Sequence, residues 1–352
     1  RFEITPVKRI SETKLAAAAM VSALSRIDIH SALALSALSR EPLDDNARRT
    51  SGAHHTDFRL AQLIGRKAAE LNVDRRSIID PACGAGILLV ATTLETCGLD
   101  RLATAKWLAD RVHACDVSAS ALRGARLALA SLTDDLDAIT DMTRNWQVGD
   151  SLLRDPAAWA SDCPGGFGAV VANPPWEKLK VLRHEFDQAA GSLRHYGAAH
   201  LEEPSAGLAK KRDAVQSYSR LLAERYPLAA SGEIDLFMAF TELLMRLAGA
   251  DGGIAALLPA GLIRSQTTMA LRRTLMERFS SLHFTVITNK ARFFAIDTRF
   301  KFLAVSGTVK PHLGQPGIGI SYCIADDDMC AETDGAQISL AKLRSLRPDL
   351  TA

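Results

Sequence analysis

A strong charge imbalance, long apolar runs and paired cysteines are all missing from this sequence. Its 352 residues hold 42 Lys and Arg against 40 Asp and Glu, a formal net charge of +2. With 47% hydrophobic and 23% charged residues, the composition excludes a wholly disordered or collagen-like chain. At roughly 150 residues per domain, the length fits two domains or one large α/β domain with appendages.

Membrane and secretion signals are absent as well. The longest segment without Lys, Arg, Asp or Glu is residues 311–325, which contain two Pro and three Gly. A membrane span needs roughly 18 apolar residues, so this segment is too short and too polar. No charged region followed by an apolar one opens the sequence, so no secretory signal is indicated. We expect a cytoplasmic protein with no membrane partner.

The six cysteines form neither a C-x-x-C pair nor a dense framework. This spacing predicts reduced thiols of a cytoplasmic protein rather than disulfides or zinc ligands, and we expect no metal. They are Cys83, Cys97, Cys115, Cys163, Cys323 and Cys330.

Two kinds of pattern follow one another along the chain. Residues 11–40 are rich in Ala, Leu and Ser and predict one or two helices, and residues 57–71 have apolar positions at helical spacing. From residue 77 short apolar runs alternate with helical segments, which is typical of a doubly wound, mostly parallel sheet. The runs are residues 77–80, 111–116, 146–149, 168–172, 253–258, 282–288 and 302–306.

These patterns suggest a division of the chain. Residues 1–50 form a helical N-terminal segment and residues 51–310 the main domain. Within that domain the polar residues 177–231 are too long for an ordinary connection, which predicts a helical insertion or lid. Pro and Gly accumulate after Lys310, so residues 311–352 are expected to start a following region or to form a tail.

A glycine-rich loop follows the first apolar run. Residues 78–86 read IIDPACGAG, and Gly84 and Gly86 let the backbone turn sharply and approach a ligand closely. Leu89 occupies the place of the third glycine of the dinucleotide motif, which weakens an NAD interpretation. Asp80 at the strand end suits a ligand that carries an ammonium group.

Two further acids follow the next strands. Asp116 is placed to accept hydrogen bonds from ribose hydroxyls, and Asp150 offers an acceptor for an adenine amino group. Together with Asp80 this set suits S-adenosylmethionine. For each acid alone, capping of the next helix is the alternative.

A second motif, Asn173-Pro174-Pro175-Trp176, follows the fourth apolar run. The Asn173 carboxamide oxygen and the Pro174 carbonyl can both accept hydrogen bonds from one planar amine, and so direct its lone pair at an electrophilic methyl group. Trp176 offers a flat face on which the ring that bears the amine can stack. A proline-rich turn without chemistry is the alternative.

Together the two motifs resemble those of adenine-N6 DNA methyltransferases of the gamma type. Residues 80–86 are similar to D-P-A-C-G-S-G with Ala85 for Ser, and residues 173–176 match N-P-P-[YFW]. The resemblance is to the modification parts of type I and fused type II restriction systems and to related phage-defence methylases. It implies a Rossmann-like class I S-adenosylmethionine-dependent fold with a seven-stranded, mostly parallel sheet.

Further segments extend the resemblance over residues 50–308. Residues 51–57 are similar to T-G-[SA]-Y-Y-T-P, with His54 and His55 for the aromatics. In residues 289–301 the family places an aromatic that stacks on the flipped base, which points to Phe294 or Phe293, with core packing as the alternative. The cofactor residues implied are Gly52, Thr56, Asp80, Pro81, Ala82, Gly84, Gly86, Asp116, Val117, Asp150 and Ser151, and the catalytic residues are Asn173, Pro174, Pro175 and Trp176.

The resemblance implies methylation of adenine N6 in double-stranded DNA by base flipping, in a bacterial restriction-modification or phage-defence system. It also implies partners: a specificity or restriction subunit, or additional domains that specify the DNA sequence. Methylation of guanine N2 in RNA or of a protein glutamine stays open, since those enzymes share the N-P-P motif. A catalytically inactive scaffold is the other alternative.

The basic residues are unevenly distributed. Residues 264–301 contain eight Lys and Arg against two acids, which is 8 − 2 = +6 in a chain whose total is +2. Phosphate contacts need such a local surface, and a solvated helix face is the alternative. The basic residues are Arg264, Arg272, Arg273, Arg278, Lys290, Arg292, Arg299 and Lys301.

Overall fold

The structure, a computed structural model, describes residues 29–39, 55–72, 76–176, 206–230, 234–294, 296–309, 317–325 and 330–346, together with Ala19 and Ser22. Most of the expected N-terminal segment and residues 177–205 of the expected insertion lie outside these ranges. No helix among the described residues is long and apolar enough to cross a membrane.

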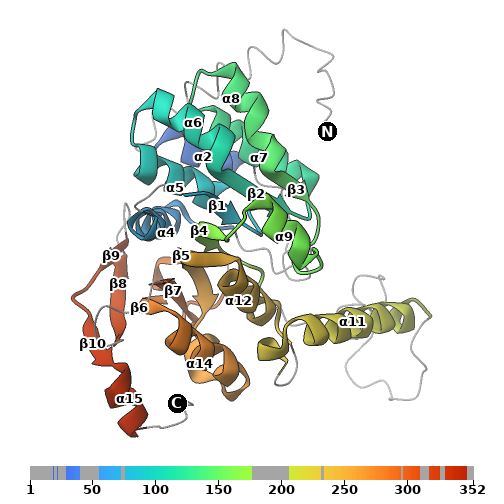
Figure 1. Cartoon of the computed structure of the whole chain (residues 1–352), viewed down its shortest axis with the longest axis vertical. Coiled ribbons are helices and arrows are strands. Elements are labelled where there is room, and N and C mark those ends of the chain that lie inside the picture. Colours follow the sequence, from blue (N-terminus) through green and yellow to red (C-terminus); the bar gives the residue numbers. More distant parts are fainter. Residues whose placement is uncertain are drawn as a thin grey trace.

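A ten-stranded mixed sheet runs through the described part of the molecule (Figure 1). The strand order is β10-β8-β6-β7-β5-β4-β1-β2-β3, and β9 pairs with β8. The strands are β1 Ile78–Asp80, β2 Val112–Asp116, β3 Trp146–Val148, β4 Phe167–Ala172, β5 Ala248–Pro259, β6 Ser280–Thr288, β7 Lys301–Thr308, β8 Gly317–Ala325, β9 Cys330–Glu332 and β10 Ala336–Ser339.

Each of the seven predicted runs lies in or overlaps one of the strands β1 to β7, but the strand count is ten rather than seven. β8 pairs in parallel with β6, while β10 and β9 pair antiparallel with the first and last residues of β8. β7 is antiparallel to both β5 and β6. The Pro and Gly that suggested an exit from the domain precede β8, and they do not prevent the chain from returning to pair with the sheet edge.

Helices cover both faces of the sheet. They are α2 Ser31–Leu38, α4 Phe58–Leu71, α5 Ile87–Cys97, α6 Arg101–Arg111, α7 Ala119–Ala130, α8 Leu136–Asp141, α9 Pro156–Asp162, α11 Ala206–Arg225, α12 Leu236–Leu247, α13 Gly261–Arg264, α14 Met269–Arg278 and α15 Leu340–Leu346. Short 3-10 helices are η1 Met142–Asn145, η2 Pro227–Ala229, η3 Gln266–Thr268 and η4 Asn289–Ala291.

The two hydrophobic cores follow from the alternation of side chains along the strands. Ile78 joins the core under α2 and α4 to α7, while its neighbour Ile79 joins the core under α9, α12 and α14. Likewise, Val171 joins the first of these cores and its neighbour Val170 joins the second. Successive side chains of a strand point to opposite faces, so a continuous apolar run supplies both cores.

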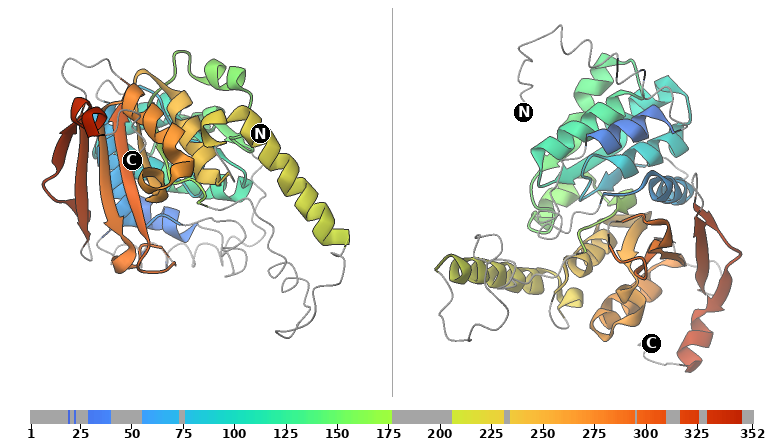
Figure 2. Two further views of the ribbon diagram at one scale, coloured as in Figure 1. Left: turned by 90° about the horizontal axis from the view of Figure 1, so that it is seen from below. Right: turned by 180° about the vertical axis from the view of Figure 1, so that it is seen from behind.

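Two predicted helical regions are confirmed where the structure describes them. The amphipathic pattern of residues 57–71 corresponds to α4, which Asp57 caps by accepting a hydrogen bond from the Arg59 amide at 2.9 Å. Within the expected insertion, α11 forms a 20-residue helix that projects from the body of the molecule (Figure 2).

Candidate active site

The glycine loop makes a sharp turn between β1 and α5. Gly84 and Gly86 have φ of 52° and 77°, a conformation that side chains with a Cβ rarely adopt. A Cβ on Gly86 would also lie only 2.7 Å from the Cβ of Ala125 on α7. The loop therefore needs both glycines, as its sequence predicts.

Asp80 ends β1 and is almost completely buried, with 1% of its surface exposed. One of its carboxylate oxygens accepts a hydrogen bond from the Ala82 amide at 3.0 Å. Burial raises the pKa of Asp80 to about 8, and the carboxylate of Asp116 adds to the rise. No Lys or Arg of the described residues lies within ion-pair distance of Asp80, so an ammonium group of a ligand would supply the missing counter-charge and favour the ionised carboxylate.

The other two strand-end acids are tied to neighbouring loops. Asp116 accepts hydrogen bonds from the amides of Gly84 and Ser118, both at 2.8 Å, and so links the end of β2 to the glycine loop. Its neighbour Val117 is exposed. Asp150 accepts from the Leu152 amide at 2.9 Å and from the Tyr218 hydroxyl at 2.7 Å. None of the three acids caps the helix that follows it, because the N-caps of α5, α7 and α9 are Gly86, Ser118 and Asp155.

Ser151 connects the loop after β3 to the glycine loop. It is buried, and its hydroxyl donates a hydrogen bond to the carbonyl of Pro81 at 2.5 Å. The loop after β3 therefore supports the glycine loop directly. The predicted residues Pro81 and Ser151 lie together, although 70 positions separate them in the sequence.

The Asn-Pro-Pro-Trp segment leaves the end of β4 beside the same loop. The Asn173 carboxamide nitrogen donates a hydrogen bond to the Thr56 hydroxyl at 3.0 Å. Pro174 is buried, and Pro175 and Trp176 are half-buried. A cavity of about 60 Å³ is lined by residues of all three motifs, among them Thr56, Asp80, Ala82, Gly84 and Asn173. Gly52 lies outside the described residues.

Two residues at the site, Ser36 and Tyr218, were not predicted from the sequence, and His55 was named only as a departure from the family segment. Ser36 on α2 lines the cavity, and its buried hydroxyl donates to the carbonyl of Ala85 at 2.7 Å. His55 also lines the cavity. Tyr218 reaches Asp150 from α11. No local pattern distinguishes Ser36 or Tyr218 from other polar helix positions, whereas His55 stands in a recognised segment where the family has an aromatic residue.

Trp176 packs into an aromatic cluster with Phe294, Phe300 and Phe302. Its ring centroid lies 4.8 Å from that of Phe294 in an edge arrangement and 5.8 Å from that of Phe300 at an interplanar angle of 19°. Phe294 is 3% exposed, whereas Phe300 is 38% exposed. The structure therefore brings Trp176 and Phe294 together, with Phe294 packed as a core residue in this conformation.

The basic segment divides into internal and exposed residues. Arg272 is 2% exposed, and its guanidinium donates to the carbonyls of Leu262 and Ser265 at 2.9 and 2.8 Å. The expectation of a phosphate contact does not fit Arg272, because its side chain is buried and its Nη1 donates to acceptors inside the protein. Arg273 pairs with Glu277 at 3.0 Å. Four residues of the segment that follows β6 are exposed: Lys290, Arg292, Arg299 and Lys301.

Comparisons with known proteins show similarity at the level of the fold. No protein-family model and no curated protein matches the sequence. The DrdV–DNA complex matches with a TM-score of 0.54 and 15% identity, over 89% of this chain and 32% of that chain. The type IIG restriction endonuclease BpuSI matches with a TM-score of 0.55 and 15% identity, over 87% of this chain and 33% of that one.

A type I restriction-modification methyltransferase subunit from Streptococcus thermophilus matches with a TM-score of 0.51 and 14% identity, over 85% of this chain and 58% of the subunit. The chain thus spans less than two thirds of each of these three proteins. The chain is a mixed α/β protein whose fold is similar to that of a restriction-modification methyltransferase subunit.

Proposed function

We propose that this chain is a Rossmann-like, class I S-adenosylmethionine-dependent methyltransferase that acts on adenine N6 in double-stranded DNA, within a restriction-modification or phage-defence system. One observation carries the proposal. Thr56, Asp80 and Asn173 come from three separate motifs and line one small cavity. The fold that the chain shares with a methyltransferase subunit supports the same function.

Residues that line the cavity or lie on the neighbouring loops suit the groups of S-adenosylmethionine, which supplies an electrophilic methyl group when bound. The buried carboxylate of Asp80 is placed to bind the ammonium group of the methionine part. Asp116 would accept hydrogen bonds from the ribose and Asp150 from the adenine amino group, with Val117 against the adenine ring. The glycine loop, free of Cβ atoms at Gly84 and Gly86, lets the ligand approach the backbone closely.

Asn173 and Pro174 would hold the target amine. The hydrogen bond from the Asn173 nitrogen to Thr56 fixes the orientation of the carboxamide, and therefore where its oxygen points. That oxygen and the Pro174 carbonyl would accept the two hydrogens of the adenine amino group. Preorganised acceptors of this kind favour the lone pair that attacks the methyl group.

Trp176 would stack on the flipped adenine. Extruding a base from the duplex costs a few kcal/mol, and stacking on an aromatic ring is worth roughly 1–3 kcal/mol per base. Phe294 and Phe300 pack against the indole of Trp176 and hold it in place. A base that stacks on Phe294 itself would require the cluster to open, because Phe294 is buried.

Methyl transfer from labelled S-adenosylmethionine tests the proposal. Duplex DNA, RNA and protein are offered as acceptors, and mass spectrometry identifies the modified base. We expect N6-methyladenine from duplex DNA and little transfer to the other acceptors. Transfer to guanine N2 in RNA or to a protein glutamine would overturn the proposed acceptor and leave the cofactor assignment standing.

Asn173→Ala separates catalysis from cofactor binding. We expect a loss of methylation of at least a hundredfold, with S-adenosylmethionine binding by calorimetry changed less than threefold. Asn145→Ala, on η1, provides the matched control. Full activity of the Asn173→Ala variant contradicts the mechanism, and a wild-type chain that binds no S-adenosylmethionine indicates an inactive scaffold.

A further inference from the structure

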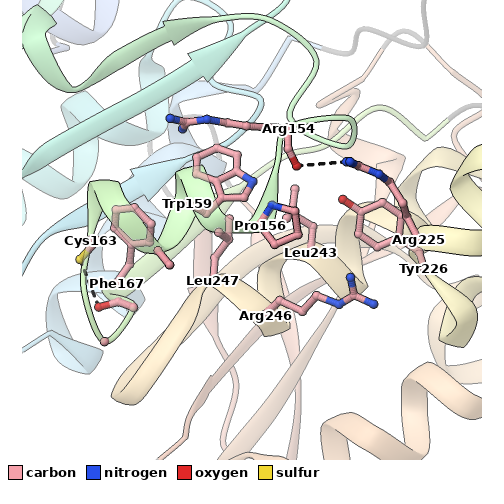
Figure 3. Close-up of a pocket in the computed structure, with 13 residues that line it drawn as sticks. Arg154, Pro156, Trp159, Cys163, Phe167, Arg225, Tyr226, Leu243, Arg246 and Leu247 are labelled. Atoms are coloured by element: carbon pink, nitrogen blue, oxygen red, sulfur yellow. Dashed lines mark hydrogen bonds between the residues drawn. The ribbon is translucent and has the colours of Figure 1, made fainter.

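A second cavity of about 390 Å³ lies beside the start of β4, whereas the candidate active site follows the end of that strand. Figure 3 shows the residues that line this cavity. It is bounded by α9, the start of β4, the end of α11 and the last turn of α12. Phe167 begins β4 and lines this cavity, whereas Asn173 follows the end of the same strand. These two residues are six positions apart along the strand, a distance of about 20 Å. No residue lines both cavities, although the Arg225 end of this one adjoins the loop that carries Asp150.

The walls of this cavity are mainly apolar and aromatic. Its volume lies within the range of roughly 300–1,000 Å³ that is common for small-molecule sites. The side chains that form the walls are Trp159, Phe167, Tyr226, Leu243 and Leu247. Such walls suit the body of a compact organic molecule.

One buried donor in the wall has no acceptor. Trp159 is 6% exposed, and its indole Nε1 makes no hydrogen bond to any of the described residues. In Figure 3 this nitrogen is on the side of the ring that faces Pro156 and Tyr226, toward the centre of the lining residues. Buried polar groups usually have a partner, so the orphan N–H points to a ligand with an acceptor group.

Three guanidinium groups surround the same cavity and leave a surplus of positive charge. Arg154 pairs with Asp162 at 2.6 Å, and Arg246 pairs with Glu242 at 2.5 Å. Arg225 donates instead to the carbonyls of Leu152 and Arg154, both at 3.1 Å, and no described carboxylate lies within ion-pair distance of it. The charged residues that line the cavity are all arginines, so its lining suits an anionic group on a ligand.

We propose that this cavity binds a small organic anion: an aromatic or branched apolar body that carries one carboxylate or phosphate group. The body packs against Trp159, Tyr226 and Leu243. The anionic group lies at Arg225, which its two carbonyl partners hold in place, and an acceptor atom of the ligand takes the Trp159 N–H. Binding here does not depend on the methyltransferase assignment.

Calorimetric titration of the full chain with 3-phenylpropionate and with phenyl phosphate tests the proposal, and 3-phenylpropanol serves as the neutral analogue. We expect at least one anion to bind with a Kd below 1 mM and at least tenfold more tightly than the alcohol. S-adenosylmethionine at saturation should leave that affinity unchanged. Failure of both anions to bind at 5 mM overturns the proposal, as does competition with S-adenosylmethionine.

Two variants locate the binding. Arg225→Gln should weaken anion binding at least tenfold, while Arg220→Gln, an equal charge change at an exposed position of the same helix, should change it less than twofold. Ala160→Phe introduces a ring from the exposed rim of the cavity and should abolish binding of the anions. Thermal unfolding confirms that each variant is folded. Equal losses for Arg220→Gln and Arg225→Gln, or unchanged binding in Ala160→Phe, would place the anion elsewhere and overturn the proposal.

Discussion

At the scale of single residues, the strand-end positions were the part of the site that sequence alone could predict. Asp80 ends an apolar run, Gly84 and Gly86 stand in the loop after it, and Asn173 directly follows another run. Their location at one edge of a parallel sheet therefore follows from the strand pattern. Ser36 and Tyr218 could not be predicted in this way. Each reaches the site through a contact between helices and loops far apart in the sequence, and no local pattern encodes such a contact.

The buried carboxyl of Asp80 predicts a pH dependence of stability. Its pKa in the folded chain is raised to about 8 from 3.8, mainly by burial. The folded state therefore binds the proton more tightly, and the stabilisation is complete below the unfolded pKa and lost as the pH rises toward 8. Between pH 5 and 7, the free energy of unfolding should fall by at most about 1.4 kcal/mol per pH unit relative to Asp80→Asn.

Urea denaturation of both proteins at several pH values measures this difference. Asp137→Asn, a change at an exposed position of α8, should follow the wild type at every pH. Parallel stability curves for the wild type and Asp80→Asn would show that Asp80 titrates normally.

At the scale of elements, the apolar runs predicted strands β1 to β7 but could not predict their directions or the three strands that follow. β7 inserts antiparallel between β5 and β6, an arrangement set by pairing rather than by composition. β8 was missed because Pro and Gly precede it and its residues 317–325 alternate small and apolar side chains in a segment without charge. Its parallel partner, β6, is not its neighbour in the sequence, because β7 lies between them.

The turn from β1 into α5 predicts a difference between two glycines that both have a positive φ. Gly86 at φ 77° would place a Cβ against Ala125, whereas Gly84 at φ 52° has no atom within 4 Å of its Cβ position. Gly84→Ala should cost about 1–2 kcal/mol, the penalty of the positive φ alone. Gly86→Ala should cost at least about 1 kcal/mol more, because overpacking against α7 adds to that penalty. Chemical denaturation measures both, and equal losses would show that the loop can shift away from α7.

The exposed part of the basic segment predicts a salt-dependent interaction with DNA, if the proposed function holds. Lys290→Ala and Arg292→Ala together should lower the slope of log K against log salt concentration by about one for each phosphate that the variant no longer neutralises. Lys342→Ala, on α15, is the matched control. Fluorescence anisotropy with a labelled duplex gives the slopes. An unchanged slope in the double variant would show that Lys290 and Arg292 do not contact DNA phosphates.

At the scale of the whole molecule, the net charge of +2 did not indicate the local basic segment, and the length did not indicate how the chain is arranged. All ten described strands belong to one sheet, with a core on each face. The C-terminal strands are tied back to α4 by an ion pair of 2.8 Å between the buried Lys67 and Glu332. Thr285 and Ser321 also donate hydrogen bonds to Glu332.

Glu332→Gln should therefore destabilise the whole fold. Lys67 would lose its counter-charge in a buried position, at a cost of about 2 kcal/mol once the partial exposure of Glu332 is allowed for. Burial alone would raise the pKa of Glu332, but hydrogen bonds from Lys67 and Thr285 outweigh it and hold that pKa below its usual value. The stabilisation is present at neutral pH and lost as the pH falls through that lowered pKa.

Urea denaturation at pH 7 and pH 3 compares this variant with Glu277→Gln, which breaks the exposed pair with Arg273. The control should lose less than about 0.5 kcal/mol. A Glu332→Gln variant as stable as the control at pH 7 would contradict the structural role of the pair.

The same ion pair has a consequence for the time course of biosynthesis. Lys67 and Glu332 are 265 positions apart, and at roughly 5–20 residues per second the ribosome needs roughly 13 to 50 s to travel between them. Throughout that interval α4 has been made but the strand that covers its flank has not. Until the C-terminal strands emerge, Lys67 of the nascent chain lacks its counter-charge and one edge of the sheet is uncovered. We expect chaperones to bind the nascent chain in this state.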